Sequence, residues 1–308
     1  ISAALVKFDH TQIRLVTSPI ANSTDSKEIG AKLANELNHF PDLKGVILLS
    51  DGLNSNGSRL IEGFNSVVGQ KVVIAGGLAG DGSRFSTTWV VKDGQPTQGQ
   101  TMALGLYGAN IELKHSTRGG WDIFGPERII TKSKDNVLYE IDGRPALDLY
   151  KEFLGVKKKD LPASALLFPL QIRGSANDEK RLVRTILNID ESNQSMIFAG
   201  DMPEGWMAQL MCANFDRIID GAADAAEELV GNQKNDSLTI AISCVGRRIV
   251  LGERAEEEVE ALTTTLGSQA NVIGFYSYGE LAPYMTDSPC ELHNQSMTIL
   301  NIVEKKAA

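Results

Sequence analysis

The residues best suited to binding chemistry lie near the end of the chain, in the segment GFYSYGELAP at positions 274–283. Because side chains alternate along a strand, Tyr276 and Tyr278 are expected to share one face. Their phenol rings offer apolar area with one hydroxyl each, and Glu280 can accept hydrogen bonds from a ligand ammonium group or be held by Arg247. These groups suit an amino acid or a similar zwitterion. The alternative is that the tyrosines only pack within the core.

A glycine-rich segment offers a second set of groups that contact ligands. The sequence GGLAGDGS occupies positions 76–83, directly after a predicted strand at residues 72–75. Glycine adopts positive φ without steric cost, and consecutive backbone N–H groups in such turns can form an anion-binding nest. Ligands of α/β proteins commonly bind beyond the carboxyl ends of strands. We expect this segment either to contact a ligand or to form a tight chain crossing. The residues concerned are Gly76, Gly77, Gly80 and Asp81.

The segment SCVGRR at positions 243–248 carries a thiol and two guanidinium groups at the end of a predicted buried strand. Arg247 is expected to receive a ligand carboxylate while Glu280 receives the ammonium group. Cys244 would be a nucleophile only if a neighbouring cation lowered its pKa, and no histidine is near it in sequence. A thiol hydrolase that uses Cys244 and Glu280 is an alternative hypothesis. The incomplete catalytic set favours a protein that is not an enzyme.

The sequence disfavours a zinc site and a nucleotide-hydrolysing P-loop. The four histidines are isolated, without HxxxH or HExxH spacing, so no zinc site is predicted. His293 follows the GFYSYGELAP segment and is expected to lie beside it. The segment GLNSNGSR at positions 52–59 has the frame of a phosphate-binding P-loop but carries Ser58 where lysine is required. Nucleotide hydrolysis is therefore disfavoured.

Hydrophobic periodicity places these segments within a repeated α/β pattern. In the first part of the chain, the pattern predicts alternating strands and helices, then a hairpin at Asp93-Gly94 and a last strand. These elements are expected at residues 13–17, 27–38, 45–50, 59–68, 72–75 and 101–107. The second part repeats this order, with elements expected at residues 206–211, 215–230, 238–244, 254–266, 271–278 and 297–303. An extra hairpin at residues 182–190 and 195–200 indicates mixed sheets.

The pattern predicts an α/β fold of two pseudo-repeated halves with mixed β-sheets packed together. Glycine and proline gather between residues 119 and 143, and a helix is predicted to follow at residues 145–154. We therefore place a boundary near Gly143, which divides the chain into modules 1–143 and 144–308.

Composition narrows the class of protein. With 308 residues, a hydrophobic fraction of 42% and a net charge of −9, the chain is an ordinary globular sequence. Its lysines and arginines are scattered, so nucleic acid is not an expected partner. The cysteines, Cys212, Cys244 and Cys290, form no CxxC pair, which fits a reducing compartment, and the cytoplasm is expected. No apolar run is long enough to span a bilayer. The sequence begins at Ile1 rather than Met, so residues upstream are expected.

Five segments in order, GGLAGDGS, ALDLYKEFLG, CVGRRIVLG, GFYSYGELAP and LHNQSMTI, resemble the FIST family, named for F-box and intracellular signal transduction. The resemblance covers nearly the whole chain. Residues 1–143 resemble the N-terminal FIST module and residues 144–308 the C-terminal module. The positions that match the family's segments are Gly76, Gly77, Gly80, Asp81, Cys244, Gly246, Arg247, Tyr278, Gly279, Glu280, His293 and Asn294.

The resemblance implies an intracellular sensory protein that binds a small ligand, for which amino acids are proposed in the family. It implies that the signal passes to a separate partner, such as a histidine kinase, a diguanylate cyclase or a chemoreceptor. We expect the pocket where the 76–83, 243–248 and 274–283 segments converge, without a cofactor. Some family members resemble haem-based nitric oxide sensors. In that alternative, His293 or another histidine would be an axial ligand with Cys244 or Cys290 nearby, and the haem would be non-covalent because CxxCH is absent.

Overall fold

The computed structural model describes residues 3–230 and 237–305. The first repeat forms half of a nine-stranded sheet, and its elements follow the predicted order. They are β1 (Gln12–Pro19), α1 (Ser26–Asn38), β2 (Leu43–Ser50), α2 (Gly57–Asn65), β3 (Val73–Ala79) and β6 (Gln100–Tyr107). The predicted hairpin is confirmed as β4 (Val90–Lys92) and β5 (Gln95–Thr97), with Asp93 and Gly94 both at positive φ. Positive φ at both central residues is the requirement of a type I′ turn.

The second repeat completes the sheet in mirrored order. The sheet runs β1-β6-β2-β3-β18-β17-β20-β7, with β19 paired to β18. The elements added by the second repeat are β7 (Ile111–Arg118), α4 (Phe215–Glu227), β17 (Ser237–Cys244), α5 (Val245–Leu251), α6 (Ala255–Leu266), β18 (Asn271–Pro283), β19 (Cys290–His293) and β20 (Met297–Glu304). Strand pairs β2/β3 and β17/β18 are parallel whereas their neighbours are antiparallel, so the predicted mixed sheet of two repeated halves is confirmed.

The first strand of the second repeat differs from the prediction. Residues 206–211 were predicted to form that strand, but this segment forms β16 (Met207–Cys212) in another sheet. The position equivalent to β1 is taken by β7, which pairs with β20 as β1 pairs with β6. Hydrophobic alternation shows that a segment is a strand, but it does not show which neighbour the strand pairs with.

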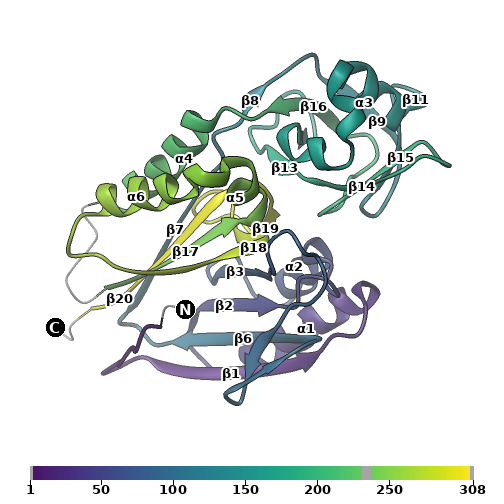
Figure 1. Ribbon diagram of the computed structural model, residues 1–308. Coiled ribbons are helices and arrows are strands. Elements are labelled where there is room, and N and C mark those ends of the chain that lie inside the picture. Colours follow the sequence, from purple (N-terminus) through teal and green to yellow (C-terminus); the bar gives the residue numbers. More distant parts are fainter. Residues whose placement is uncertain (1–2, 231–236, 306–308) are drawn as a thin grey trace.

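Between β7 and α4 the chain leaves the large sheet and builds a separate lobe (Figure 1). We call this lobe, residues 119–213, the β-lobe. Its strands are β8 (Asp122–Ile123), β9 (Arg128–Lys134), β10 (Val137–Ile141), β11 (Arg144–Pro145), β12 (Leu170–Arg173), β13 (Leu182–Arg184), β14 (Ile186–Asp190), β15 (Ser195–Phe198) and β16, with helix α3 (Ala146–Leu154). The predicted hairpin is confirmed as β14 and β15.

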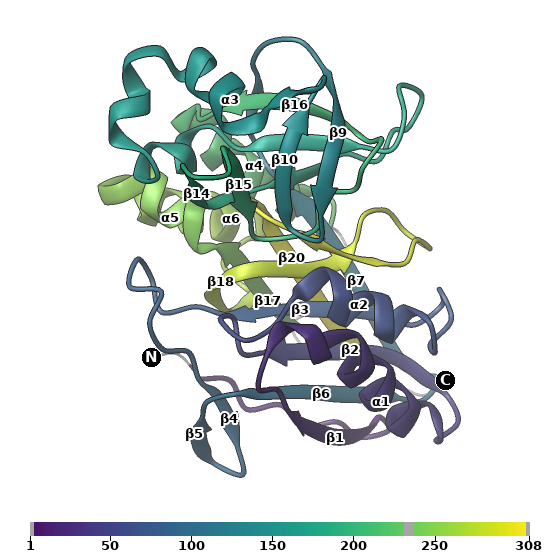
Figure 2. The same ribbon diagram turned by 90° about the vertical axis from the view of Figure 1, so that its right-hand side faces the viewer.

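The predicted boundary near Gly143 lies inside the β-lobe, in the hairpin that joins β10 to β11. Strands from both sides of this residue occur in each of the two large sheets. The boundary therefore separates two stretches of sequence but not two bodies in space. β7, from the first stretch, pairs with β20 of the second at the end of the strand order. Figure 2 shows the large sheet below the β-lobe.

Apolar layers hold the large sheet and its helices together. Helices α1 and α2 bury Leu33, Leu37 and Phe64 against one outer face of the first half-sheet. Helices α4 and α6 bury Ala222 and Leu262 against the second half-sheet, in a different cluster. The inner faces of the half-sheets share a third cluster that includes Ala75, Leu106, Leu300 and Ile302. Burial of these faces is the main stabilising contribution in a fold of this kind.

The curvature that brings the inner faces together is visible at Gly45 on β2. A Cβ added there would lie 2.5 Å from Cδ1 of Leu113 on β7, at the far end of the sheet order. Glycine therefore permits the close approach of two distant strands. Short 3-10 helices complete the fold at Ser23–Asp25, Gly155–Asp160, Ala163–Leu167 and Gly252–Arg254. No helix in the described residues is both long and apolar enough to cross a membrane.

Candidate functional site

The two segments expected to line a shared cavity are neighbouring strands. Gly76 and Gly77 lie within β3 and pair with Leu281 and Glu280 of β18. A Cβ on Gly76 would lie 1.8 Å from the carbonyl oxygen of Leu48, and one on Gly77 would lie 3.1 Å from Cγ2 of Ile242. These glycines therefore allow close packing in the sheet, and the predicted nest at this point is corrected to a strand. There is no room for a ligand between the paired segments.

Asp81 and Tyr278 meet just past the end of β3, as a structural pair. The Tyr278 hydroxyl donates to the Asp81 carboxylate, which also accepts from the backbone N–H groups of Ser86 and Thr87. The Tyr278 ring stacks on Phe85 with ring centroids 4.7 Å apart. The hydrogen bond from Tyr278 holds the pKa of Asp81 well below its usual range, and burial with the Asp81 contact raises the pKa of Tyr278 to about 12. Gly80 packs against the Tyr278 ring, so this corner is filled.

Arg247 is buried and has its own protein partners. Its Nε donates to Glu258 at 2.7 Å, Nη2 donates to the carbonyl of Ile218 at 2.6 Å, and Nη1 donates to the carbonyl of Gly119. The exposed fraction of both charged side chains is 0%. A buried ion pair of this geometry ties α5 to α6, α4 and the start of the β-lobe. The expectation that Arg247 receives a ligand carboxylate is therefore corrected, because its donors are occupied.

Glu280 lies at the centre of a buried polar cluster that we define as Glu280, Ser277, Ser296, Cys244 and Gln295. Its carboxyl group accepts from the hydroxyls of Ser277 and Ser296 and from the Ser296 backbone N–H. Burial raises the pKa of Glu280 to about 8, so the group is predominantly neutral at pH 7, and its own O–H then donates within this cluster in place of one of the accepted bonds. With its lone pairs used inside the protein, Glu280 is not positioned to receive a ligand ammonium group.

Cys244 and the loop after β19 complete this buried region. Burial raises the pKa of the Cys244 thiol, and the nearby Glu280 carboxyl raises it further. This is the opposite of the shift that activates a nucleophilic thiol. Asn294 donates from Nδ2 to the carbonyl of His293, while its Oδ1 and both polar side-chain atoms of Gln295 are buried without a hydrogen-bond partner among the described residues. The structure thus brings Cys244, Glu280 and Asn294 into one region, but away from solvent.

His293 does not fit the role of an axial haem ligand. The residue is 5% exposed, Nε2 lies 3.0 Å from the carbonyl oxygen of Ala282, and the Tyr284 ring stacks beside the imidazole. Burial lowers the pKa of His293 to about 4, so the ring is neutral and its Nε2–H donates to that carbonyl. A haem would have to displace both the hydrogen bond and the stacked ring. Within residues 3–230 and 237–305, no group of three or more metal-binding side chains is placed to hold a metal ion.

Of the predicted site residues, Tyr276 is the one that reaches an open groove. The groove has a volume of about 540 Å³ and lies between α5, α6 and the face of β18. We call it the α5–α6 groove; it is lined by Arg248, Gly252, Glu253, Ala255, Glu256, Val259, Glu260, Thr263 and Tyr276. The elements that form it stand side by side in Figure 1. Its place next to the carboxyl end of the parallel strand β17 is typical of binding sites in α/β folds.

Charged and aromatic groups line the α5–α6 groove. The Arg248 guanidinium carbon lies 4.9 Å from the centroid of the Tyr276 ring, a cation–π contact. In the described part of the chain, Arg248 forms no ion pair, and neither do Glu253, Glu256 and Glu260. Burial of the Tyr276 phenol raises its pKa, so the hydroxyl is a donor at pH 7. The groove therefore presents an unpaired cation on an aromatic ring opposite unpaired carboxylates.

The charged residues of this groove were not predicted from the sequence. Arg248 directly follows Arg247, and only the fold decides which of the two points inward. Glu256, Glu260 and Thr263 recur at spacings of four and three, which places them on one face of a helix. That spacing was a usable signal, but a row of acids on a helix more often faces solvent without a ligand.

The fold and the groove define an α/β protein whose two repeats share one sheet, carry one inserted β-lobe and present a polar groove beside the second parallel strand pair. The FIST N domain model matches residues 1–144 and the FIST C domain model matches residues 146–283, which together cover most of the chain. The chain belongs to the FIST family, whose domains are signal-transduction sensor domains. No curated protein matches the sequence.

Proposed function

We propose that this sensor domain binds a small zwitterion of the amino-acid class in the α5–α6 groove. The observation that carries the proposal is the unpaired Arg248 guanidinium, stacked on Tyr276, across a groove from the unpaired carboxylates of α6. A ligand carboxylate would pair with Arg248, and its ammonium group with Glu256 or Glu260. The volume of about 540 Å³ is within the usual range for small-molecule sites.

The charge of the groove favours one subclass of zwitterion. Three carboxylates, those of Glu253, Glu256 and Glu260, face a single guanidinium. A ligand with a second positive charge, such as a basic amino acid, would leave fewer carboxylates unpaired than a neutral one would. An acidic amino acid would add a negative charge to a groove that already has an excess. We expect basic amino acids to bind more tightly than neutral ones, and acidic ones least tightly.

A route for the signal leads from the groove into the protein. Arg248 is next to Arg247 in α5, and Arg247 joins α5 to Glu258 of α6 and to the backbone of α4. A ligand that draws α5 and α6 together would bias the packing around this buried pair. We propose that the change passes to a separate signalling protein, such as a histidine kinase, a diguanylate cyclase or a chemoreceptor, consistent with the role of FIST domains as sensors.

Calorimetric titration and thermal denaturation with L-lysine, L-arginine, glycine and L-glutamate test the proposal. A ligand at one hundred times its Kd should raise the unfolding free energy by about 2.7 kcal/mol. Arg248→Gln should weaken binding of all zwitterions, and Glu256→Gln should weaken lysine more than glycine. Lys32→Gln, at an exposed position of α1, is the matched control for removal of one charge. If no amino acid binds, or if Arg248→Gln binds as well as the wild type, the proposed site is wrong.

A further inference from the structure

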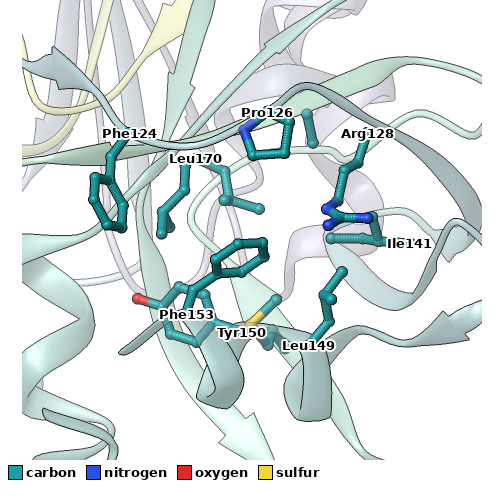
Figure 3. Close-up of a pocket in the computed structure, with 11 residues that line it drawn as sticks. Phe124, Pro126, Arg128, Ile141, Leu149, Tyr150, Phe153 and Leu170 are labelled. Carbon is teal, nitrogen blue, oxygen red and sulfur yellow. The ribbon is translucent and has the colours of Figure 1, made fainter. Parts of the chain in front are cut away.

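Apolar surface outside the α5–α6 groove includes a pocket in the β-lobe and one edge of the large sheet. Figure 3 shows the pocket, whose walls include Leu149 and Phe153 of α3. Its volume of about 20 Å³ has room for about one water molecule, so the pocket belongs to the core of the β-lobe. At the sheet edge, by contrast, Ile13 and Leu15 of β1 are 55% and 50% exposed. Another protein chain can reach these two side chains.

Strand β1 is the outermost strand of the large sheet (Figures 1 and 2), and in the described part of the chain it pairs with β6 alone. Each residue of a strand directs its N–H and C=O groups to one side, and successive residues alternate sides. Ile20, which continues the register of β1, donates from its N–H to the carbonyl of Gly99, so the even-numbered residues direct these groups toward β6. The odd-numbered residues Ile13, Leu15 and Thr17 therefore direct theirs to the open edge.

Both ends of this open edge are closed to further pairing. The N–H of Thr11 donates to the Glu304 carboxylate at 2.6 Å, and Pro19 has no N–H to donate. Folded proteins commonly protect a sheet edge in such ways against pairing with another chain. The three odd-numbered residues between these ends keep N–H and C=O groups without a partner among the described residues. The middle of the edge is therefore a site whose backbone groups fit an extended strand.

The unpaired residues of this edge are complementary to themselves about Leu15. When two β1 strands lie antiparallel with Leu15 opposite Leu15, Ile13 of each copy lies opposite Thr17 of the other. Each unpaired N–H of one copy then meets an unpaired C=O of the other, and the closed ends, Thr11 and Pro19, face each other. A slip by two residues places Ile13 or Thr17 opposite a closed end and loses hydrogen bonds. One register therefore satisfies the whole edge.

Charge does not oppose this contact, although the chain carries a net charge of −9. Arg14 is the single charged residue of β1, and its guanidinium carbon lies 3.5 Å from the centroid of the Phe40 ring. In the register centred on Leu15, Arg14 lies opposite Val16 of the other copy and not opposite a second arginine. The charged residues of α1, which packs on β1, are exposed and balanced in sign: Lys27, Glu28, Lys32 and Glu36. Two copies can therefore approach at this edge without strong repulsion.

We propose that two copies of this chain pair edge to edge through β1, antiparallel and centred on Leu15, so that their large sheets join into one. This two-fold contact uses the same residues from both copies. Backbone hydrogen bonds supply the recognition, and the contacts of Leu15 with Leu15 and of Ile13 with Thr17 cover the exposed aliphatic side chains. The α5–α6 groove is lined by residues of the other repeat, so ligand binding and pairing use different surfaces.

Sedimentation equilibrium of the full chain over a range of concentrations tests the pairing. We expect the wild type to form a dimer. Leu15→Lys places two ammonium groups at the centre of the contact and should raise the dimer Kd by at least about tenfold. Leu187→Lys is the matched control, because Leu187 is 45% exposed on β14, the last strand in the order of the other large sheet, and it should leave the Kd unchanged. Urea denaturation verifies that each variant is folded.

Disulfide cross-linking tests the register, with the half-buried thiol removed by Cys212→Ser in every variant. Leu15→Cys should form a disulfide-linked dimer on mild oxidation, because opposite Cα atoms about 5.5 Å apart are within the range of a disulfide. Ile13→Cys should not cross-link to itself, since its two copies lie four residues apart along the strands, about 13 Å. A mixture of Ile13→Cys and Thr17→Cys should form the mixed dimer.

Three results would overturn the proposal. A wild type that stays monomeric at the highest concentration reached would exclude pairing of two copies and leave the open edge to a strand of a different protein. Equal dimer Kd values for the wild type and a folded Leu15→Lys would place the contact elsewhere. Cross-linking of Ile13→Cys to itself as efficiently as Leu15→Cys would refute the register centred on Leu15.

Discussion

Replacing Glu280 with glutamine should remove a pH dependence of stability that the buried cluster creates. The Glu280 side chain is 0% exposed, and its hydrogen-bond partners, Ser277 and Ser296, are neutral. Burial raises its pKa from the ordinary value of 4.5 to about 8. The folded protein therefore holds a proton on Glu280 at pH 7, whereas the unfolded chain releases it above pH 4.5.

The sign and size of the effect follow from this difference. Between pH 4.5 and pH 8 the folded state binds one more proton than the unfolded state, so the free energy of unfolding falls as pH rises. Each pKa unit corresponds to about 1.4 kcal/mol, which sets an upper limit of about 5 kcal/mol over the window. Glutamine has no ionisable proton. Its amide can donate to Ser277 and its carbonyl can accept from Ser296, so the fold is retained.

Urea denaturation at one-unit intervals from pH 5 to pH 9 measures the effect. Relative to wild type, Glu280→Gln should gain up to about 1.4 kcal/mol of unfolding free energy per pH unit as the pH rises to 8, and nothing further above it. Glu36→Gln, at an exposed position of α1, is the control and should run parallel to wild type. A difference between Glu280→Gln and wild type that stays constant across the window would refute the inference that burial keeps this carboxyl group neutral.

Two further predictions concern the packing of the sheet and the thiols. Gly76→Ala should destabilise the protein by about 3 kcal/mol or more, because the added Cβ would overlap the Leu48 carbonyl. Gly69→Ala, where nothing lies within 4 Å of the added Cβ, should have little effect. Urea denaturation at one pH compares the two variants, and similar midpoints would contradict the register of β2 and β3. Iodoacetamide at neutral pH should modify the half-buried Cys212 of the native protein before the buried Cys244. Peptide mass spectrometry follows the modification of each thiol. Rapid alkylation of Cys244 would instead support the thiol hydrolase hypothesis.

Much of the secondary structure could be predicted from the sequence, because buried strands and amphipathic helices have distinct hydrophobic periods. The helix predicted at residues 27–38 is α1, and the strand predicted at residues 45–50 lies within β2. The Asp93-Gly94 hairpin was predictable because few residues tolerate positive φ at both central positions. The repeat of the α/β order was visible in the same pattern, although its first strand was misplaced.

The site could be predicted only in part, because the sequence shows which polar residues exist but not which ones have partners within the fold. Arg247 and Glu280 have the residue types of a zwitterion site, yet the structure satisfies both internally. Both tyrosines were expected to line one shared cavity, but Tyr276 lines the α5–α6 groove, while Tyr278, two positions along β18 and beside a register shift between Ser277 and Gly279, donates to Asp81. Such an irregularity in strand pairing leaves no clear signal in one sequence.

The sequence by itself determined the alternating strands and helices, the repeat and the family, since these depend on local periodicity and on ordered motifs. Tertiary structure decided that β7 begins the second repeat, that the segments around Gly77 and Glu280 pair without space between them, and that Arg248 faces outward beside Tyr276. The physical reason is the same in each case. Pairing and burial depend on contacts between residues far apart in the chain, and each such contact determines whether a polar group is satisfied inside the protein or left free for a ligand.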